Sequence, residues 1–369
     1  MTEWALRQRL YCLLIVGAAS ALSVPADLGR AARELSTFEQ PPIGIVAIDL
    51  AGHQTALTHD PGWDVNPAIA RDGRVAFFSD RDGVAADLFV MDGDGGNVRR
   101  VTNGAVDNSG VALGEDLAWS QASWSPRGDQ IAFDGKYGAE PATCVQHCAG
   151  WDVLVVGSDG SELRQIARGA RAPAWSPDGR RLAYESSIDA YYAAGSVTIT
   201  GLDGSGSVQV KAANTDSEVG PVWSPRGSEI AFQAVFQGRL WIYTVRVDGT
   251  RKRRLTTGHN PAWSPDGRRL AFIDNYELLT IDRNGKGKRR LSRKGQSVLG
   301  AAWSPKGGTL AFVVGTTAGC CPLNRRLETV SADGTHLRIV AREHAGTQIQ
   351  DSPVWTRDGK RILITVASP

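Results

Sequence analysis

Methionine is scarce in this 369-residue sequence, which contains only two, and beyond residue 24 no apolar run is long enough to cross a bilayer. Acidic and basic residues nearly cancel, leaving a formal net charge of +2, so no global charge favours nucleic acid or an anionic membrane as a partner. The sequence also has no Gly-x-Ser-x-Gly nucleophile elbow and no glycine-rich phosphate loop leading into a helix. These absences argue against a membrane-embedded protein, a nucleic-acid binder and the common nucleophile and nucleotide chemistries.

The amino-terminal region has the pattern of a secretory signal. Arg7 and Arg9 precede an apolar stretch over residues 10–24, and small residues at 19–21 and at 24–26 each offer a cleavage site. The stretch is shorter than the ~20 residues that a spanning helix needs, which favours a cleaved signal over an anchor. We therefore expect a signal peptide at 1–26, a linker at 27–42, and an exported protein in the periplasm, the cell envelope or the extracellular space.

Glycine, with 42 residues, and tryptophan, with 11, are both abundant. The motif Pro-Ala-Trp-Ser-Pro-Asp-Gly-Arg-Arg-Leu-Ala-Phe occupies residues 261–272. Ser-Pro-Asp-Gly is typical of a type I turn, and the continuous Leu-Ala-Phe run indicates a strand covered on both faces. The motif thus predicts a hairpin of two inner strands. Similar segments occupy residues 122–133, 173–184, 221–232, 301–312 and 353–364, and one that lacks the tryptophan occupies 67–78.

Each motif is followed by two more strand signals that flank an Asp-Gly or Asn-Gly turn. A unit of four strands and about 40 residues is the signature of a β-propeller blade. The chain holds six such units, a carboxy-terminal half at 353–366 and an amino-terminal half at 43–58. We expect an all-β fold, a seven-bladed β-propeller of four-stranded blades, with the ring closed by the amino-terminal strands pairing with the carboxy-terminal half-blade. Six blades is the alternative.

Trp-Ser-Pro-Asp-Gly-x-x-Leu-Ala-Phe, followed by a strand ending in Asp-Gly and then by Arg-x-Leu-Thr, resembles the WD40-like (PD40) repeat of TolB-family propellers. The resemblance covers residues 43–366 and implies a propeller domain over that range. It also implies one of several roles, since the family's repeat occurs in envelope scaffolds and in the lid domains of peptidases. TolB itself has a further domain ahead of its propeller, and residues 27–42 are too few for one.

The connections between the predicted strands differ in length on the two faces of the ring. Turns between strands one and two and between three and four share one face, the short-turn face, while all other connections lie on the opposite, long-loop face. Long connections gathered on one face of a regular scaffold are typical of a binding face. The insertions occupy residues 103–121, 134–151, 185–195, 213–220, 315–326 and 342–352. The candidate binding residues there are Trp119, His147, Trp151, Tyr191, Tyr192 and His344.

Four cysteines remain beyond the signal, namely Cys144, Cys148, Cys320 and Cys321. Export favours disulfides among them, and three pairings are possible. The alternative is a metal site with His147 as an added ligand, but the spacing fits no standard zinc pattern. We therefore expect disulfides, no bound metal and no cofactor.

These features predict a monomeric binding or scaffolding module whose partner is a protein or a cell-envelope component, without catalytic residues. The alternative is a carbohydrate-active lyase or hydrolase with a metal or histidine site at the central funnel. Four histidines in connecting segments are its candidates: His59, His147, His259 and His344. Basic runs such as residues 251–254 and 286–290 fall at the start of fourth strands, where lysine and arginine block edge-to-edge pairing.

Overall fold

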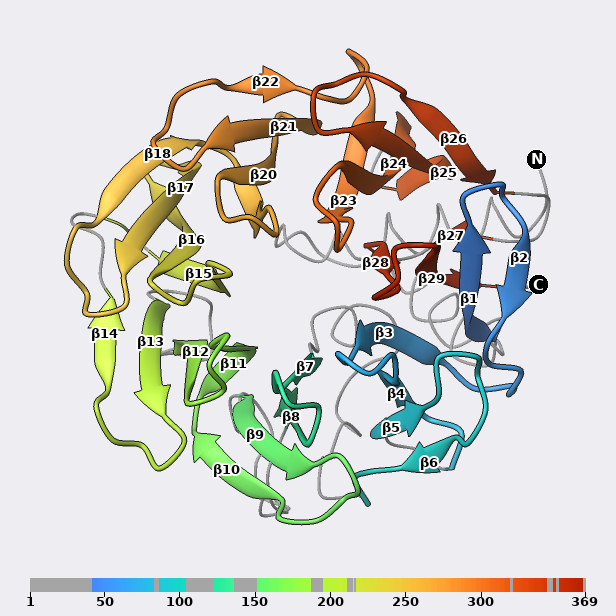
Figure 1. The fold of residues 1–369 in the computed structure, drawn as a ribbon, viewed down its shortest axis with the longest axis horizontal. Helices are drawn as coiled ribbons and strands as arrows, with labels where there is room; N and C mark the ends of the chain where they lie inside the picture. Colours follow the sequence, from blue (N-terminus) through green and yellow to red (C-terminus); the bar gives the residue numbers. More distant parts are fainter. Residues whose placement is uncertain are drawn as a thin grey trace, which may run out of the picture.

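The structure is a computed structural model that describes residues 42–82, 86–103, 122–135, 151–186, 195–210, 215, 217–318, 321–343, 348–349 and 352–367. The described part of the chain forms seven antiparallel sheets arranged in a ring around a central axis (Figure 1). No helix in it is long and apolar enough to cross a membrane. The predicted all-β propeller with seven blades is confirmed.

The blades are numbered here in chain order. Blade 1 is β3 (Asp64–Ile69), β4 (Val75–Ser79), β5 (Asp87–Met91) and β6 (Arg99–Arg100). Blade 2 is β7 (Ala122–Trp124), β8 (Gln130–Gly135), β9 (Asp152–Gly157) and β10 (Arg164–Ala167). Blade 3 is β11 (Ala170–Trp175), β12 (Arg181–Ser186), β13 (Ser196–Gly201) and β14 (Val208–Val210). Blade 4 is β15 (Ser217–Trp223), β16 (Glu229–Phe236), β17 (Arg239–Arg246) and β18 (Arg253–Thr257).

Blade 5 is β19 (His259–Trp263), β20 (Arg269–Asp274), β21 (Glu277–Asp282) and β22 (Arg289–Arg290). Blade 6 is β23 (Ser297–Trp303), β24 (Thr309–Ala318), β25 (Cys321–Ser331) and β26 (Arg338–Arg342). Blade 7 combines both ends of the propeller: β27 (Gln348–Ile349), β28 (Val354–Trp355) and β29 (Arg361–Ala367) with β1 (Ile43–Asp49) and β2 (Gln54–Ala56).

Pairing of β1 with β29 closes the ring. The register runs from Ile43 opposite Ala367 to Asp49 opposite Arg361, and β2 then forms the outer strand. Figure 1 shows β1, in blue, beside β29, in red. The predicted closure is therefore confirmed. It leaves no inner strand unpaired at the point where the ring begins and ends.

The core lies between neighbouring blades and follows from the Leu-Ala-Phe run. In blade 5, Leu270, Ala271 and Phe272 are all buried. Leu270 and Phe272 pack with Ala231 of blade 4, whereas Ala271 packs with Phe312 of blade 6. In blades 1 to 6 the second strand thus presents large residues to the preceding blade and an alanine to the following one, whereas β29 of blade 7 presents Leu363 to blade 1. Because the alanine leaves room, the next blade's tryptophan can approach closely.

The repeat's tryptophans link successive blades through their indole N–H groups. Trp303 Nε1, for example, donates to the carbonyl oxygen of Ala262, 3.1 Å away in the preceding blade. The same bond is made by Trp124 to Ala68, Trp223 to Ala174, Trp263 to Val222 and Trp355 to Ala302. The repeated aromatic residue therefore packs the core and also satisfies a carbonyl at the blade junction.

One insertion differs from its predicted form. Residues 315–326 were expected as an inserted loop, but β24 and β25 continue through most of this segment, with Ala318 opposite Cys321. The ladder extends with a register shift between Val314 and Thr316. Thr316 and Thr317 are β-branched and favour a strand, and the two segments pair with each other without another blade. The insertion is a β-ribbon that lengthens blade 6.

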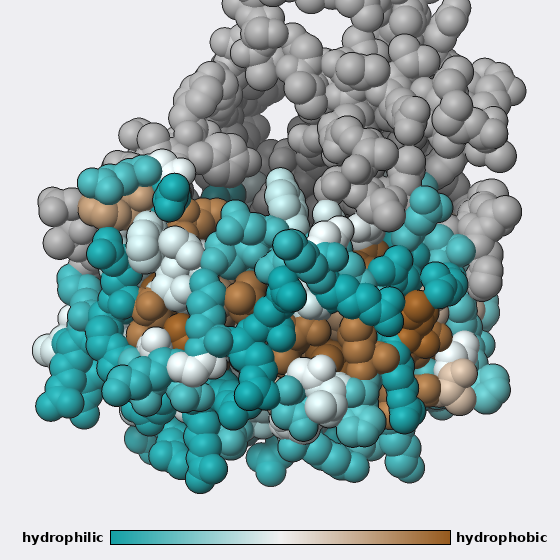
Figure 2. Space-filling view, turned by 90° about the horizontal axis from the view of Figure 1, so that it is seen from above, coloured by the Kyte–Doolittle hydropathy of each residue, from teal (hydrophilic) through white to brown (hydrophobic). Residues whose placement is uncertain are grey.

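The outer strands carry exposed arginines, including Arg253 and Arg254 on β18 and Arg289 and Arg290 on β22. Figure 2 shows the ring edge-on, with hydrophilic side chains spread over the wall and apolar residues visible between them. Arginines on edge strands discourage pairing with another sheet. Their position agrees with the interpretation of the basic runs as edge protection.

Candidate functional site

The two faces of the ring are built differently. In every blade, the turn between strands one and two is closed by a bond from its glycine N–H to the carbonyl three residues earlier, and so is the turn between strands three and four. All of these N···O distances lie between 2.8 and 3.1 Å. The connections on the long-loop face instead vary from the single residue Gly258 to the span 101–121. Because the tight turns are alike in every blade, the short-turn face offers little variation in backbone shape. A surface that recognises a specific partner is more readily built from the varied connections of the long-loop face.

Most of the predicted binding residues lie outside the described residues: Trp119, His147, Tyr191, Tyr192 and His344, together with Cys144, Cys148 and Cys320. Trp151 is half-buried just before β9, on the long-loop side of blade 2, and its carbonyl accepts a bond from Ala170 N. Cys321 begins β25 at the far end of the β-ribbon. The disulfide prediction and the predicted binding residues thus stay predictions.

Ion pairs whose carboxylate is buried or partly buried line the long-loop ends of several blades. In blade 1, Arg81 Nη2 lies 2.9 Å from Asp64 Oδ1, and the Asp64 carboxylate is fully buried. In blade 3, Arg171 Nη2 lies 2.8 Å from Glu185 Oε1. Further pairs join Arg100 to Asp87, Lys288 to Asp274 and Arg326 to Glu328. A buried carboxylate that has lost its hydration needs such a partner, so each pair fixes the position of a polar group beneath this face.

Two of these pairs have perturbed acids. Burial raises the pKa of Glu185, and the Arg171 guanidinium opposes this shift only in part. Burial also acts to raise the pKa of Asp274, but hydrogen bonds from Lys288 Nζ and Thr257 Oγ1, both at 2.9 Å, outweigh it, and the pKa is lowered. The two blade ends therefore place carboxyl groups of different proton affinity at the same face.

The candidate histidines are separated in the described part of the chain. His59 is exposed in the connection between β2 and β3, whereas His259 is the first residue of β19. Burial lowers the pKa of His259, against a hydrogen bond with Asn260 and the nearby Asp274 carboxylate. No group of three or more histidine, cysteine, aspartate or glutamate side chains within the described ranges is arranged to hold a metal.

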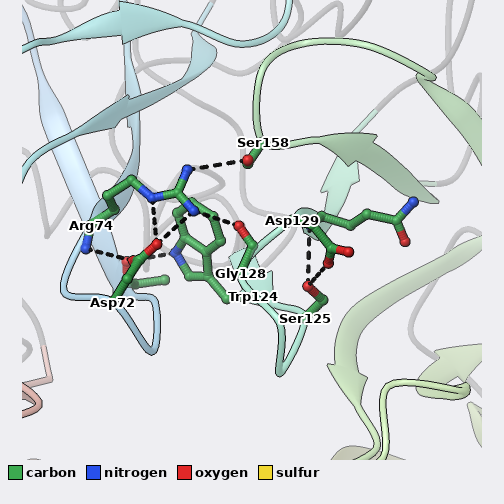
Figure 3. A network of polar contacts seen from close by, with 9 residues as sticks. Asp72, Arg74, Trp124, Ser125, Gly128, Asp129 and Ser158 are labelled. Carbon is green, nitrogen blue, oxygen red and sulfur yellow. Dashed lines mark hydrogen bonds and ion pairs between the residues drawn. The ribbon is translucent and has the colours of Figure 1, made fainter.

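On the short-turn face, Arg74 connects blade 1 to blade 2 (Figure 3). Its guanidinium bonds Asp72 in its own turn, and Nη2 donates to the carbonyl of Gly128 at 2.6 Å while Nη1 donates to Ser158 Oγ at 3.2 Å. It also lies 5.0 Å from the ring centroid of Trp124. Arg181 lies over Trp223 in the same way, at 5.2 Å. Stacking of arginine on the next blade's indole adds a cation–π contact to these junctions.

Sequence reasoning missed the buried ion pairs and the arginine–indole stacking. The available signal was weak, because Glu185 follows the Leu-Ala-Tyr run directly while its partner Arg171 precedes the Trp of the same motif. Only the pairing of β11 with β12, which sets Arg171 opposite Glu185, brings the two together.

The family of the TolB β-propeller domain (PD40) matches residues 142–368. The chain belongs to this family. The TolB homologue of Chlorobium luteolum is 30% identical over 135 residues, which is 34% of this chain and 30% of that protein. The stretches matched in the curated relatives make up between 26% and 36% of those proteins. The chain thus matches only a minor part of their length.

Solved structures agree with the family's fold. A TolB structure from Agrobacterium tumefaciens is 18% identical with a TM-score of 0.55, and the match covers 90% of this chain and all of that one. An oligogalacturonate lyase in complex with manganese is 16% identical with a TM-score of 0.61, over 89% of this chain and 97% of that one. At such identities the likeness shows the fold alone, because one propeller fold serves many functions.

Proposed function

We propose that this TolB-family propeller is an exported binding module that acts through its long-loop face rather than by catalysis. Its partner is a protein or a component of the cell envelope, and the chain acts as a monomer. Residues 1–26 direct export, 27–42 link the signal to the propeller, and 43–366 form the binding domain. The protein then resides in the periplasm, in the envelope or outside the cell.

The observation that carries this proposal is the difference between the faces. Tight turns of one hydrogen-bonding pattern occupy the short-turn face in every blade, whereas the long-loop face has connections of many lengths. The ion pairs of Asp64 with Arg81 and of Glu185 with Arg171 hold the blade ends beneath that face. A rigid support under varied connections is the usual construction of a recognition surface.

Capture of partners from an envelope extract tests the proposal. The bait is chain 27–369, beside a variant in which residues 136–149 and 316–325 are replaced by short turns. The control carries Arg226→Glu and Lys306→Glu, which change only the tight turns of the short-turn face. We expect the unaltered bait and the control to retain one specific protein that the trimmed variant loses.

Equal retention by all three baits would place the contact elsewhere and contradict the proposal. A second assay addresses the alternative function of a carbohydrate-active lyase or hydrolase. The same chain is incubated with oligogalacturonate and manganese, and products are separated by chromatography. Cleavage that the trimmed variant no longer performs would replace the binding role by catalysis.

A further inference from the structure

The junction between blades 7 and 1 departs from the repeat in its core. Ile69 of β3 pairs with Val75, the first residue of β4. In the other six blades the residue at this register position is tryptophan. Facing Ile69, Leu363 of β29 occupies the position that holds alanine elsewhere, and both residues belong to the same apolar cluster. At the other junctions the preceding blade contributes a small alanine and the following blade a large tryptophan. Here the preceding blade contributes the larger Leu363, and the following blade the smaller Ile69. The side chain of Ile69 also has no N–H group that could donate to the preceding blade, as the indoles do.

The turns beside this junction depart from the repeat as well. Five blades have proline as the second residue of the first turn, and each proline lies against the turn glycine of the following blade, as Pro305 does against Gly359. Blades 7 and 1 have Arg357 and Arg71 instead. A Cβ built on Gly73 would meet no atom within 4 Å among the described residues. The proline–glycine contact of the five junctions from blade 2 to blade 7 is therefore missing here.

These departures leave a pocket of about 480 Å³ on the short-turn face between β4 of blade 1 and β29 of blade 7. Its apolar residues are Ile69, Val75 and Leu363, and its rim includes Arg71, Arg357 and Arg361. Arg361 precedes Ile362 just as Arg74 precedes Val75, and its Nη2 donates to the carbonyl of Gly93 at 3.0 Å. Arg74 stacks on the indole of the next blade, but the pocket that Arg361 lines has Ile69 at the repeat position of that indole.

The charges around the pocket are unequally engaged. Its acids bond within their own turns or to a neighbour: Asp72 to Arg74, Asp92 to Asn97, Asp94 to Gly96 and Asp358 to Thr356. Arg71 and Arg357 are exposed and make no hydrogen bond or ion pair with the part of the chain that the structure describes. Two guanidinium groups, one from each side of the junction, are therefore available to an anion.

We propose that this pocket binds a planar aromatic group that carries a carboxylate. The ring lies against Ile69, which is only partly buried, and stacks on the Arg361 guanidinium, in the place that an indole occupies at the other junctions. The carboxylate lies between Arg71 and Arg357, since arginine pairs readily with carboxylates and stacks on aromatic faces. A free aromatic acid and the last residue of a polypeptide share this chemistry.

Titration calorimetry on the full propeller chain, residues 27–369, tests the proposal with three probes. N-acetyltryptophan has both ring and carboxylate, N-acetyltryptophanamide lacks the charge, and N-acetylleucine lacks the ring. We expect N-acetyltryptophan to bind at least about tenfold more tightly than either of the others, the size expected for a charge-assisted contact. Equal affinity for all three probes, or no binding of any at millimolar concentration, would overturn it.

Variants locate the site. Arg71→Ala with Arg357→Ala should lower the affinity for N-acetyltryptophan to that of the amide, while Arg268→Ala, an exposed turn arginine of blade 5, should change nothing. Ile69→Trp with Leu363→Ala fills the pocket with the repeat's own indole and should abolish binding. Undiminished binding by the filled variant would refute the site. Because the pocket lies on the short-turn face, these results are independent of partner capture by the long-loop face.

A tripeptide, Gly-Gly-Trp, distinguishes the two sources of the ligand. Binding at least as tight as that of N-acetyltryptophan supports the site as a reader of a polypeptide's carboxy-terminal aromatic residue. Binding weaker by about tenfold supports the site for a free aromatic acid.

Discussion

The indole of Trp303 bonds the carbonyl of Ala262 across the junction between blades 6 and 5, at an N···O distance of 3.1 Å. Trp175 occupies the same repeat position in blade 3, but its Nε1 is buried and has no hydrogen-bond partner within the described residues. At the same position of the repeat, the indole N–H is therefore hydrogen-bonded in Trp303 and, within the described residues, has no partner in Trp175. The pair makes the energetic contribution of the junction bond measurable.

Replacement of these tryptophans by phenylalanine should have unequal effects. Both changes remove similar apolar area, but Trp303→Phe also removes a hydrogen bond, whereas Trp175→Phe relieves a buried N–H without a partner in the described structure. We expect Trp303→Phe to lower the free energy of unfolding by about 1 kcal/mol more than Trp175→Phe. Urea denaturation followed by circular dichroism measures the difference. Equal losses would show that the junction bond contributes nothing net.

The exchanged pair at the closing junction should behave non-additively. Leu363 is fully buried, so Leu363→Ala alone opens a cavity and should cost about 3 kcal/mol. Ile69→Trp alone places a large ring against Leu363 and should cost about 1 to 3 kcal/mol. Together they restore the arrangement of the other junctions, so the double variant should be more stable than the sum predicts by at least about 1 kcal/mol. A double-mutant cycle in urea tests this, and strict additivity would mean that the two sites do not compete for space.

Two glycines with positive φ should respond differently to substitution. Gly258 has φ of 136°, and a Cβ there would lie 2.7 Å from a ring carbon of Phe272 and 2.8 Å from the carbonyl oxygen of Ile273. Gly206 has φ of 62°, and a Cβ there would meet nothing within 4 Å. We expect Gly258→Ala to cost about 3 kcal/mol or more and Gly206→Ala about 1 to 2 kcal/mol. Thermal unfolding of the two variants compares them, and similar melting temperatures would contradict the expected clash.

The blades were predictable from sequence because their signals are local. Ser-Pro-Asp-Gly specifies a turn wherever it occurs, and the apolar run after it specifies a strand covered on both faces. The features of the closing junction were not predictable, although Ile69, Leu363 and Arg357 all depart visibly from the repeat. They meet only because β1 pairs with β29 and brings the two ends of the propeller together. Likewise, spacing along the chain says nothing about which basic residue faces Glu185.

The pH dependence of stability should report on Glu185. Burial raises its pKa above the ordinary value of 4.5, so between these two values the folded protein binds more protons than the unfolded one. The free energy of unfolding contributed by this group is therefore fully present below pH 4.5 and is lost as the pH rises through the folded pKa. Glu185→Gln keeps an acceptor for Arg171 but removes the titration. We expect the variant to gain stability relative to the wild type as the pH rises from 4 to 8.

Urea denaturation at several pH values gives this difference directly. Glu229→Gln is the matched control, because Glu229 lies at the short-turn end of β16 beside the exposed Arg283, 3.1 Å away. An ion pair with one exposed partner contributes little, so this variant should show only a small difference from the wild type at every pH. If Glu185→Gln also differs from the wild type by a constant amount across the range, the carboxyl does not change its proton affinity on folding. In that case the Arg171 pair, rather than burial, controls the charge at this end of blade 3.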